Sequence, residues 1–165
     1  MPAWVSCYTW NKSQIFVLEK VSHLIDELVA GILTRKGRFL VERRRLDDEP
    51  NPGYVEIPGG HVDKGESLKE ALRRELREEL GIRVRRMSFV LNGLATASNG
   101  EKGRIHYFHV TSWQGRIEAT EAERVYWESR IERLSVPSDR RAVRRVLKSM
   151  LLVDERSAMV RVEGP

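Results

Sequence analysis

Residues 60–82 read GHVDKGESLKEALRRELREELGI, and this stretch decides the fold of the chain. Its second half predicts a helix over Ser67–Leu80, because Ser67 and Glu70 have the spacing of a capping box and Gly81 is suited to end a helix. At about 100° per residue, one broad arc of the helix is apolar and faces the core, and it consists of Leu68, Ala71, Leu72, Leu76 and Leu80.

Three glutamates of the same helix, Glu75, Glu78 and Glu79, lie in or beside the apolar arc. Carboxylates placed side by side at the margin of a core repel one another and lose hydration. Bound divalent cations would remove this conflict, since Mg²⁺ and Mn²⁺ favour carboxylate oxygens. The alternative is that the acids pair with Arg74 and Arg77 on a solvated face. The helix by itself leaves both interpretations open.

The residues around the helix resemble the Nudix box. That box reads Gly, five residues, Glu, seven residues, Arg-Glu, an aliphatic residue, any residue, Glu-Glu, any residue, Gly and an aliphatic residue, and residues 60–82 match it at every defined position. Ile57–Gly59 resembles the entry to the box, and Tyr126–Glu128 resembles the aromatic strand that follows. The resemblance covers about residues 29–150. It implies an α+β fold, an α/β/α sandwich with a mixed β-sheet between helices.

The resemblance also implies a role for each residue of the box. The cation, Mg²⁺ with Mn²⁺ as a substitute, would be bound by the carbonyl of Gly59 and by the carboxylates of Glu75, Glu78 and Glu79. Arg74 would be structural, pairing with Glu66 or a neighbouring acid to hold the loop against the helix. The backbone of the loops would depend on the glycines Gly60, Gly65 and Gly81.

The general base is left open by the sequence, and the candidate catalytic residues are Glu78, Glu79, Glu121 and Glu123. In the Nudix family the base often comes from outside the box. Glu121 and Glu123 lie where such a glutamate tends to occur, in the polar stretch just before the aromatic strand. An ordinary acidic surface loop is the alternative for these two residues, and Glu79 could act as the base instead.

The activity that the resemblance implies is metal-dependent hydrolysis of a pyrophosphate bond in a nucleoside diphosphate derivative. His106–Trp113 looks like the matching strand of enzymes that sanitise nucleoside triphosphates, oxidised ones included. We therefore favour a nucleoside triphosphate that yields a monophosphate and pyrophosphate. No asparagine follows Asn99 to recognise guanine, and Asp139 could take that place.

Other substrates and another class of function stay open. ADP-ribose hydrolases tend to have a proline near Ala97 and Ser98, and dinucleoside polyphosphate hydrolases a tyrosine near Asn99, which weakens both assignments. A nucleotide sugar or capped RNA is a further alternative. A catalytically silent Nudix-fold protein that binds a nucleotide or RNA is the alternative of another class. Such proteins usually lose metal acids, whereas this chain keeps them all.

The rest of the chain predicts more strands and a second helix. The strands are expected at Val29–Leu33, Phe39–Val41, Val55–Pro58, Val84–Leu91, Ile105–Trp113 and Val125–Trp127. The first two would form a hairpin, and the stretch 92–103 would be a loop. The helix is expected over Ser138–Leu151, with Ser138 as its N-cap. The domain would span residues 29–151, between an extension at 1–28 and a tail at 152–165.

Composition limits the number of domains, the cellular location and the class of partner. The 165 residues suit one domain, no stretch is apolar enough to cross a membrane, and the N-terminus does not read as a signal peptide. With the single cysteine Cys7, this indicates the cytoplasm. The formal charge of +5 favours a polyanion, a nucleotide or RNA, although a solvated basic surface is the alternative and RNA is not favoured. Residues 1–28 could contribute to a homodimer contact.

Overall fold

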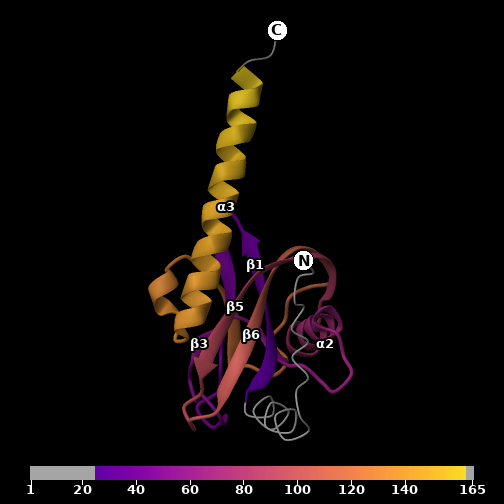
Figure 1. Cartoon of the computed structure of the whole chain (residues 1–165), viewed down its shortest axis with the longest axis vertical. Helices are drawn as coiled ribbons and strands as arrows, with labels where there is room; N and C mark the ends of the chain where they lie inside the picture. The colour runs from indigo at the N-terminus through magenta and orange to yellow at the C-terminus, as the bar shows by residue number, and fades with distance from the viewer. Residues whose placement is uncertain (1–24, 163–165) are drawn as a thin grey trace, which may run out of the picture.

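A computed structural model describes residues 25–162 of the chain, and its core is a seven-stranded mixed sheet with a long helix on each face (Figure 1). The elements in chain order are β1 (Asp26–Arg35), β2 (Arg38–Arg43), β3 (Val55–Glu56), β4 (Gly59–His61), α2 (Leu68–Leu80), β5 (Arg83–Thr96), β6 (Lys102–Gln114), β7 (Arg124–Glu128), the 3₁₀ turn η1 (Ile131–Arg133) and α3 (Pro137–Val162). No helix of this part of the chain is long and apolar enough to cross a membrane.

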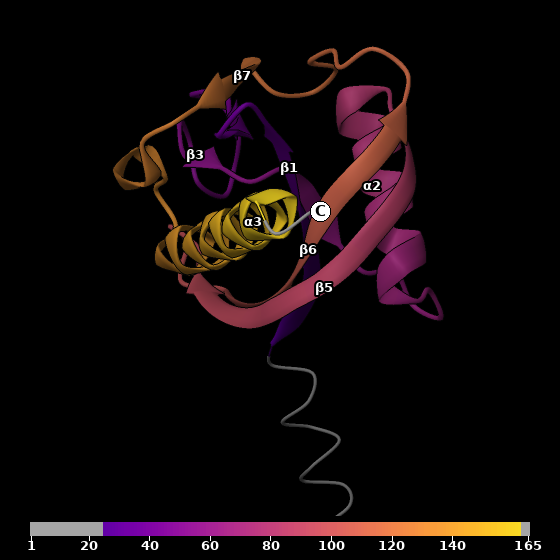
Figure 2. The same cartoon turned by 90° about the horizontal axis from the view of Figure 1, so that it is seen from above.

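Strand β1 organises the sheet. It pairs parallel with β6, with Leu28 opposite Ile105, and antiparallel with β2 and β4. The order β3-β2-β1-β6-β5 is completed by β4 on β1 and β7 on β2. Figure 2 shows α2 and α3 on opposite sides of β1, β5 and β6. Leu72 and Leu76 of α2 belong to one buried cluster and Val143 and Val146 of α3 to another, so the expected α/β/α sandwich is confirmed.

Helix α2 forms as its sequence predicts. The Ser67 side chain accepts a hydrogen bond from the Glu70 backbone N–H, and the Glu70 side chain accepts one from the Ser67 backbone, which completes the capping box. Gly81 ends the helix in a left-handed conformation with φ of 68°. Ala71, Leu72, Leu76 and Leu80 are all fully buried, so the apolar arc holds the helix in one orientation on the sheet.

Most strands are longer than expected, and three differences change the expected layout of the chain. The strand expected over Val55–Pro58 ends at Glu56, and Gly59–His61 forms a separate strand because it pairs with β1. Strands β5 and β6 extend into the stretch 92–103, which was expected to be a loop, because their backbones continue to pair as far as Thr96 and Lys102.

The third difference concerns helix α3, which begins at Pro137 and continues to Val162, past the expected end at Leu151. Proline suits the first position of a helix because its φ is already helical and it lacks an N–H that would have no partner there. Ser138 is therefore not the N-cap. Most of the expected extension over residues 1–28 lies outside the described residues.

Candidate active site

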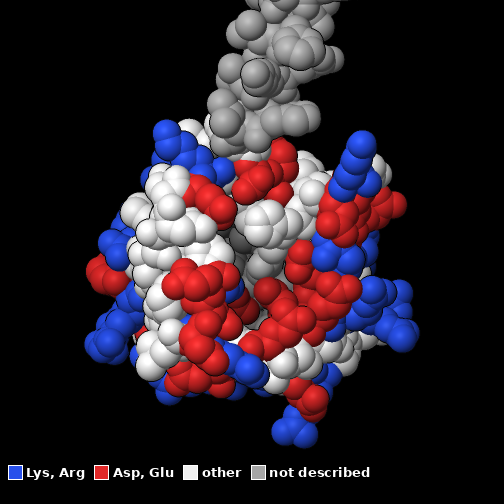
Figure 3. Space-filling model, turned by 90° about the horizontal axis from the view of Figure 1, so that it is seen from below, with Lys and Arg blue, Asp and Glu red and all other residues white. Residues whose placement is uncertain are grey.

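A cavity of about 380 Å³ opens between the loop after β2, the start of α3 and the acidic side of α2. Val29, Ala30, Ile57 and Ile105 give it an apolar wall. Its charged lining contains seven acids and, apart from His61, only two basic residues: Asp26, Glu49, Glu56, Glu75, Glu79, Glu101 and Asp139 against Arg44 and Lys102. Figure 3 shows acidic side chains gathered around a hollow in this face. The cavity is thus acidic although the whole chain carries a charge of +5.

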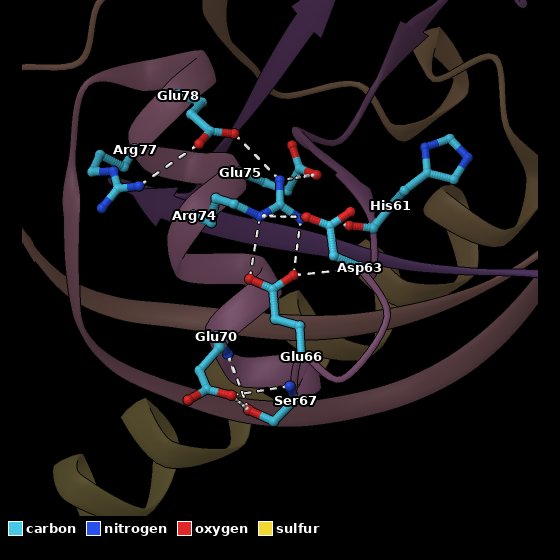
Figure 4. Close-up of polar contacts among 9 residues, drawn as sticks. All are labelled: His61, Asp63, Glu66, Ser67, Glu70, Arg74, Glu75, Arg77 and Glu78. Carbon is cyan, nitrogen blue, oxygen red and sulfur yellow. Dashed lines mark hydrogen bonds and ion pairs between the residues drawn. The ribbon is translucent and has the colours of Figure 1, made fainter.

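The guanidinium of Arg74 organises the entrance loop (Figure 4). Its Nε and Nη2 donate to the two carboxylate oxygens of Glu66 at 3.2 and 3.0 Å, and Nη2 also donates to the carbonyl of His61 at 2.8 Å. Its Nη1 donates to Glu75 Oε1 at 2.8 Å and to Glu78 Oε2 at 3.3 Å. Hydrogen bonding from Arg74 lowers the pKa of Glu66 below its ordinary value. The pair expected between Arg74 and Glu66 is therefore present.

The three glutamates of α2 occupy different environments. The side chain of Glu78 is 44% exposed and contacts both Arg74 and Arg77, whereas that of Glu75 is 14% exposed. Burial raises the pKa of Glu75. Glu79 points inward, where one carboxylate oxygen, Oε2, is buried without a hydrogen-bond partner. Burial, with the nearby charge of Glu42, raises the pKa of Glu79 well above its ordinary value. The alternative interpretation, pairing with arginines, thus applies to Glu75 and Glu78 only.

Two glycines bring the backbone of β4 close to other groups. A Cβ on Gly60 would lie 2.5 Å from the carboxyl carbon of Glu75, and one on Gly59 would lie 2.0 Å from the carbonyl oxygen of Val29. No side chain fits at Gly59, where backbone atoms are in the way, and one at Gly60 would displace the carboxylate of Glu75. The helix carboxylate can therefore lie directly against the strand that carries the Gly59 carbonyl. Gly65, in the turn before α2, has a φ of 85°.

The two candidate bases outside the helix are separated by the structure. The loop that carries them is attached to the end of α2, where Thr120 donates from its backbone N–H to the carbonyl of Glu79 at 3.1 Å and from its hydroxyl to the carbonyl of Glu78. Glu121, next in the chain, is close enough to contribute to the raised pKa values of Glu42 and Glu79. Glu123 instead pairs with Arg43 at 3.4 Å, with both side chains more than a third exposed.

Glu56 lines the cavity and Glu42 lies opposite it, and the sequence identified neither of these acids. They face each other on the antiparallel strands β2 and β3, and Glu42 is only 4% exposed. Burial, with the charge of the neighbouring acid, raises the pKa of Glu42 to about 8; burial and the charge of Asp139 raise that of Glu56 to about 7. A signal was available, because Glu42 follows Leu40 by two residues and strand side chains alternate between faces. The alternation thus places Glu42, an acid, on the face of β2 that carries Leu40 and faces the core.

Asp139 lies at the other end of the cavity and is held on two sides. Its Oδ2 accepts the backbone N–H of Ile57 at 3.0 Å, and its Oδ1 accepts the hydroxyl of Tyr107 at 2.6 Å. That hydroxyl also contacts Ser138 Oγ at 2.9 Å. Burial raises the pKa of Asp139 to about 6. The buried network fixes the start of α3 against β6 and the strand that leads into the box.

The acids do not form a closed metal centre in this conformation. Among residues 25–162, no three histidine, cysteine or acidic side chains converge in a geometry that holds a metal ion. The donor set nonetheless fits a hard divalent cation, because Glu75 and Glu79 line one cavity and Glu79 has a buried oxygen without a partner. The arrangement can therefore bind a cation next to a phosphate chain.

Comparison with known proteins agrees with this geometry. The sequence model of the NUDIX domain matches residues 27–147. The chain is 36% identical over 111 residues to the CTP pyrophosphohydrolase of Escherichia coli (strain K12), covering 67% of this chain and 81% of that protein. It is 31% identical over 104 residues to the 8-oxo-dGTP diphosphatase of Buchnera aphidicola subsp. Schizaphis graminum, covering 61% of this chain and 74% of that protein.

Solved structures show the same fold. The crystal structure of the MutT NUDIX hydrolase from Burkholderia pseudomallei superposes with a TM-score of 0.64 at 26% identity, covering 73% of this chain and 97% of that one. The solution structure of the E. coli ORF135 protein superposes with a TM-score of 0.62 at 31% identity, covering 75% of this chain and 89% of that one.

Proposed function

Because this chain belongs to the Nudix family as a pyrophosphohydrolase, we propose that it hydrolyses nucleoside triphosphates to a monophosphate and pyrophosphate with a divalent cation, Mg²⁺ or Mn²⁺. The relatives named a CTP pyrophosphohydrolase and an 8-oxo-dGTP diphosphatase support a nucleoside triphosphate as the substrate class. A cytoplasmic location, where free nucleotides are abundant, suits this reaction.

The observation that carries the proposal is the acidic lining of the cavity. A triphosphate and seven acids repel each other, so a binding site of this composition needs cations between the protein and the phosphates. The apolar wall around Ile57 and Ile105 suits the nucleoside, and the volume of about 380 Å³ lies within the range of small-molecule sites. We infer that the phosphates lie towards α2 and the nucleoside towards Asp139.

The cation would be held by Glu75, Glu78, Glu79 and the carbonyl of Gly59. When bound, it supplies positive charge that screens the phosphates and makes nearby water more acidic. Glu121 or Glu79 then accepts the proton of the attacking water as the new P–O bond forms. The anhydride bond breaks in the same displacement, and its electron pair leaves with the pyrophosphate.

Arg74 acts as a positioning residue in this scheme. It donates two hydrogen bonds to Glu66. It donates only one each to Glu75 and Glu78, both from the same nitrogen, so these two carboxylates are held more weakly. The two helix carboxylates can therefore turn to a cation without releasing the loop. Asp139 remains held by Ile57 and Tyr107, so the nucleoside end of the cavity is rigid before substrate binds.

The test is a nucleotide panel with Mg²⁺, in which phosphate and pyrophosphate are measured separately for the wild type and for Glu78→Gln. We expect the wild type to release pyrophosphate from nucleoside triphosphates. Glu78→Gln should lose about 100-fold or more of this activity, because a ligand charge is removed while side-chain size is kept. It should stay folded, since the loss of one like charge in an acidic cluster relieves repulsion.

The matched control is Glu132→Gln, the same change on an exposed residue of η1 that does not line the cavity. It should keep wild-type turnover. Activity of Glu78→Gln within a few-fold of the control would contradict the metal-site assignment. Release of phosphate without pyrophosphate would contradict the proposed reaction.

A further inference from the structure

The acids around α2 fall into two groups that differ in their partners. Glu75 and Glu78 both accept hydrogen bonds from Arg74. Glu79 lies one turn away from Glu75 and faces the sheet, where its Oε2 is buried without a partner. Within residues 25–162, no hydrogen bond or ion pair is formed by the side chain of Glu42 either. The charges of Glu42 and Glu79 thus act on each other, and Arg44 offsets that of Glu42 only in part.

The position of Glu42 follows from the register of the sheet. Leu40 packs in the cluster with Leu72 and Leu76 of α2, so Glu42, two residues further along β2, points to the α2 side as well. The charge of Arg44 lowers the pKa of Glu42, but its side chain contacts Glu56 at 3.6 Å and Asp48 at 3.8 Å. Arg44 therefore forms its ion pairs with β3 and with the loop after β2, and Glu42 lies opposite α2.

Burial of two carboxyl groups in one space is costly unless something binds both. Two protonated carboxyls could hydrogen bond to each other, but Glu42 and Glu79 make no such bond, and the partnerless Oε2 of Glu79 would stay unsatisfied. A divalent cation satisfies both oxygens and cancels their charge, and carboxylates from two elements are a common way to bind one. The two carboxylates are thus arranged as a pair of ligands for one cation.

We propose that Glu42 of β2 is a ligand of a divalent cation held between β2 and α2, with Glu79 as its opposite ligand. The cation site would then extend beyond the helix and its loop to a strand that lies before the box in the sequence. The inference rests on the proposed function for the presence of a cation, and it adds a ligand that the box does not contain.

The test measures Mn²⁺ binding to the full chain without nucleotide, by electron paramagnetic resonance of free Mn²⁺ and by calorimetry. Glu42→Gln should weaken Mn²⁺ binding by about tenfold or more. The rise in Tm that Mn²⁺ causes should shrink accordingly. Without Mn²⁺, Glu42→Gln should keep or raise the Tm, because it removes a buried acid that has no partner.

Two controls separate a ligand from a general loss of negative charge. Glu56→Gln removes the acid opposite Glu42 on β3, which already has Arg44 as a partner, and it should change Mn²⁺ affinity by less than about threefold. Glu132→Gln should bind Mn²⁺ as the wild type does. Equal weakening by Glu42→Gln and Glu56→Gln would overturn the ligand assignment, because it would indicate electrostatics alone.

Other outcomes distinguish this inference from the proposed function. Mn²⁺ affinity of Glu42→Gln within twofold of the wild type overturns the inference even if the wild type hydrolyses nucleotides. Absence of Mn²⁺ binding to the wild type at millimolar concentrations overturns it as well. If Mn²⁺ binds through Glu42 but no nucleotide is hydrolysed, the proposed substrate fails and the cation site stands.

Discussion

Replacement of Arg74 by lysine should destabilise the protein although the charge is kept. The guanidinium of Arg74 donates five hydrogen bonds, two of them to Glu66, one to the carbonyl of His61, and one each to Glu75 and Glu78. Three different nitrogens of the planar group donate these bonds. An ammonium is a single point with three donors and cannot reach Glu66 and Glu75 together.

The magnitude follows from which contacts are lost. Hydrogen bonds to charged groups contribute about 1.5 to 3 kcal/mol each when they are shielded from water. The contact with Glu78 counts for little, because that side chain is 44% exposed and the pair is screened. Arg74 itself is 24% exposed, so water replaces part of the bonds to Glu66 and Glu75. We expect a loss of about 2 to 3 kcal/mol in the free energy of unfolding.

The assay is urea denaturation of the wild type and Arg74→Lys in the absence of divalent cations. Glu66→Gln and the double variant complete a double-mutant cycle. The coupling energy should be clearly above zero, because Glu66 receives two of the five hydrogen bonds. A loss below about 0.5 kcal/mol, or a coupling energy near zero, would refute the view that the planar fork of Arg74 holds the loop against α2.

Three further predictions concern other parts of the protein. Glu121→Gln should lower the hydrolysis rate by about 10² to 10⁴-fold. Glu123→Gln should be near normal, because Glu123 pairs with Arg43 away from Glu79. Pre-steady-state rates with saturating Mg²⁺ measure both variants, and the reverse ranking would contradict the prediction. The pKa of Asp139 is raised by burial to about 6, so the folded protein keeps a proton that the unfolded chain releases, and the stabilisation present below pH 4 is lost as the pH rises to 6. The free energy of unfolding should therefore fall between pH 4 and 6.5, and in Asp139→Asn this fall should be smaller by about 2 to 3 kcal/mol. Urea denaturation at the two pH values measures it, and an equal fall in the variant and the wild type would disprove the buried acid. Replacement of the exposed Arg141 and Arg145 of α3 by alanine should leave hydrolysis of a mononucleotide and its shallow salt dependence unchanged, and a loss of that activity would favour a role for the basic face in substrate binding.

The sequence was sufficient for the features that depend on nearby residues. The capping box, the glycine C-cap and the apolar arc of α2 all lie within fifteen residues, so their hydrogen bonds and packing face can be inferred from spacing alone. The hairpin of β1 and β2 also depends on neighbouring residues, since Lys36 and Gly37 adopt the positive φ values of a tight turn. The identity of the box and of its acids also came from spacing, and the NUDIX match at residues 27–147 agrees with it.

The roles of acids outside the helix depended on contacts between distant segments. Glu121 and Glu123 are equivalent in the sequence, but backbone bonds from the loop to α2 leave Glu121 near Glu79 and place Glu123 on Arg43. Glu42 lies beside Glu56 and on the α2 side of the sheet because β2 pairs with β3 and packs under α2. Spacing along the chain cannot report such proximity, since it arises when pairing of the strands and burial of the helix bring residues far apart in sequence into one low-dielectric space.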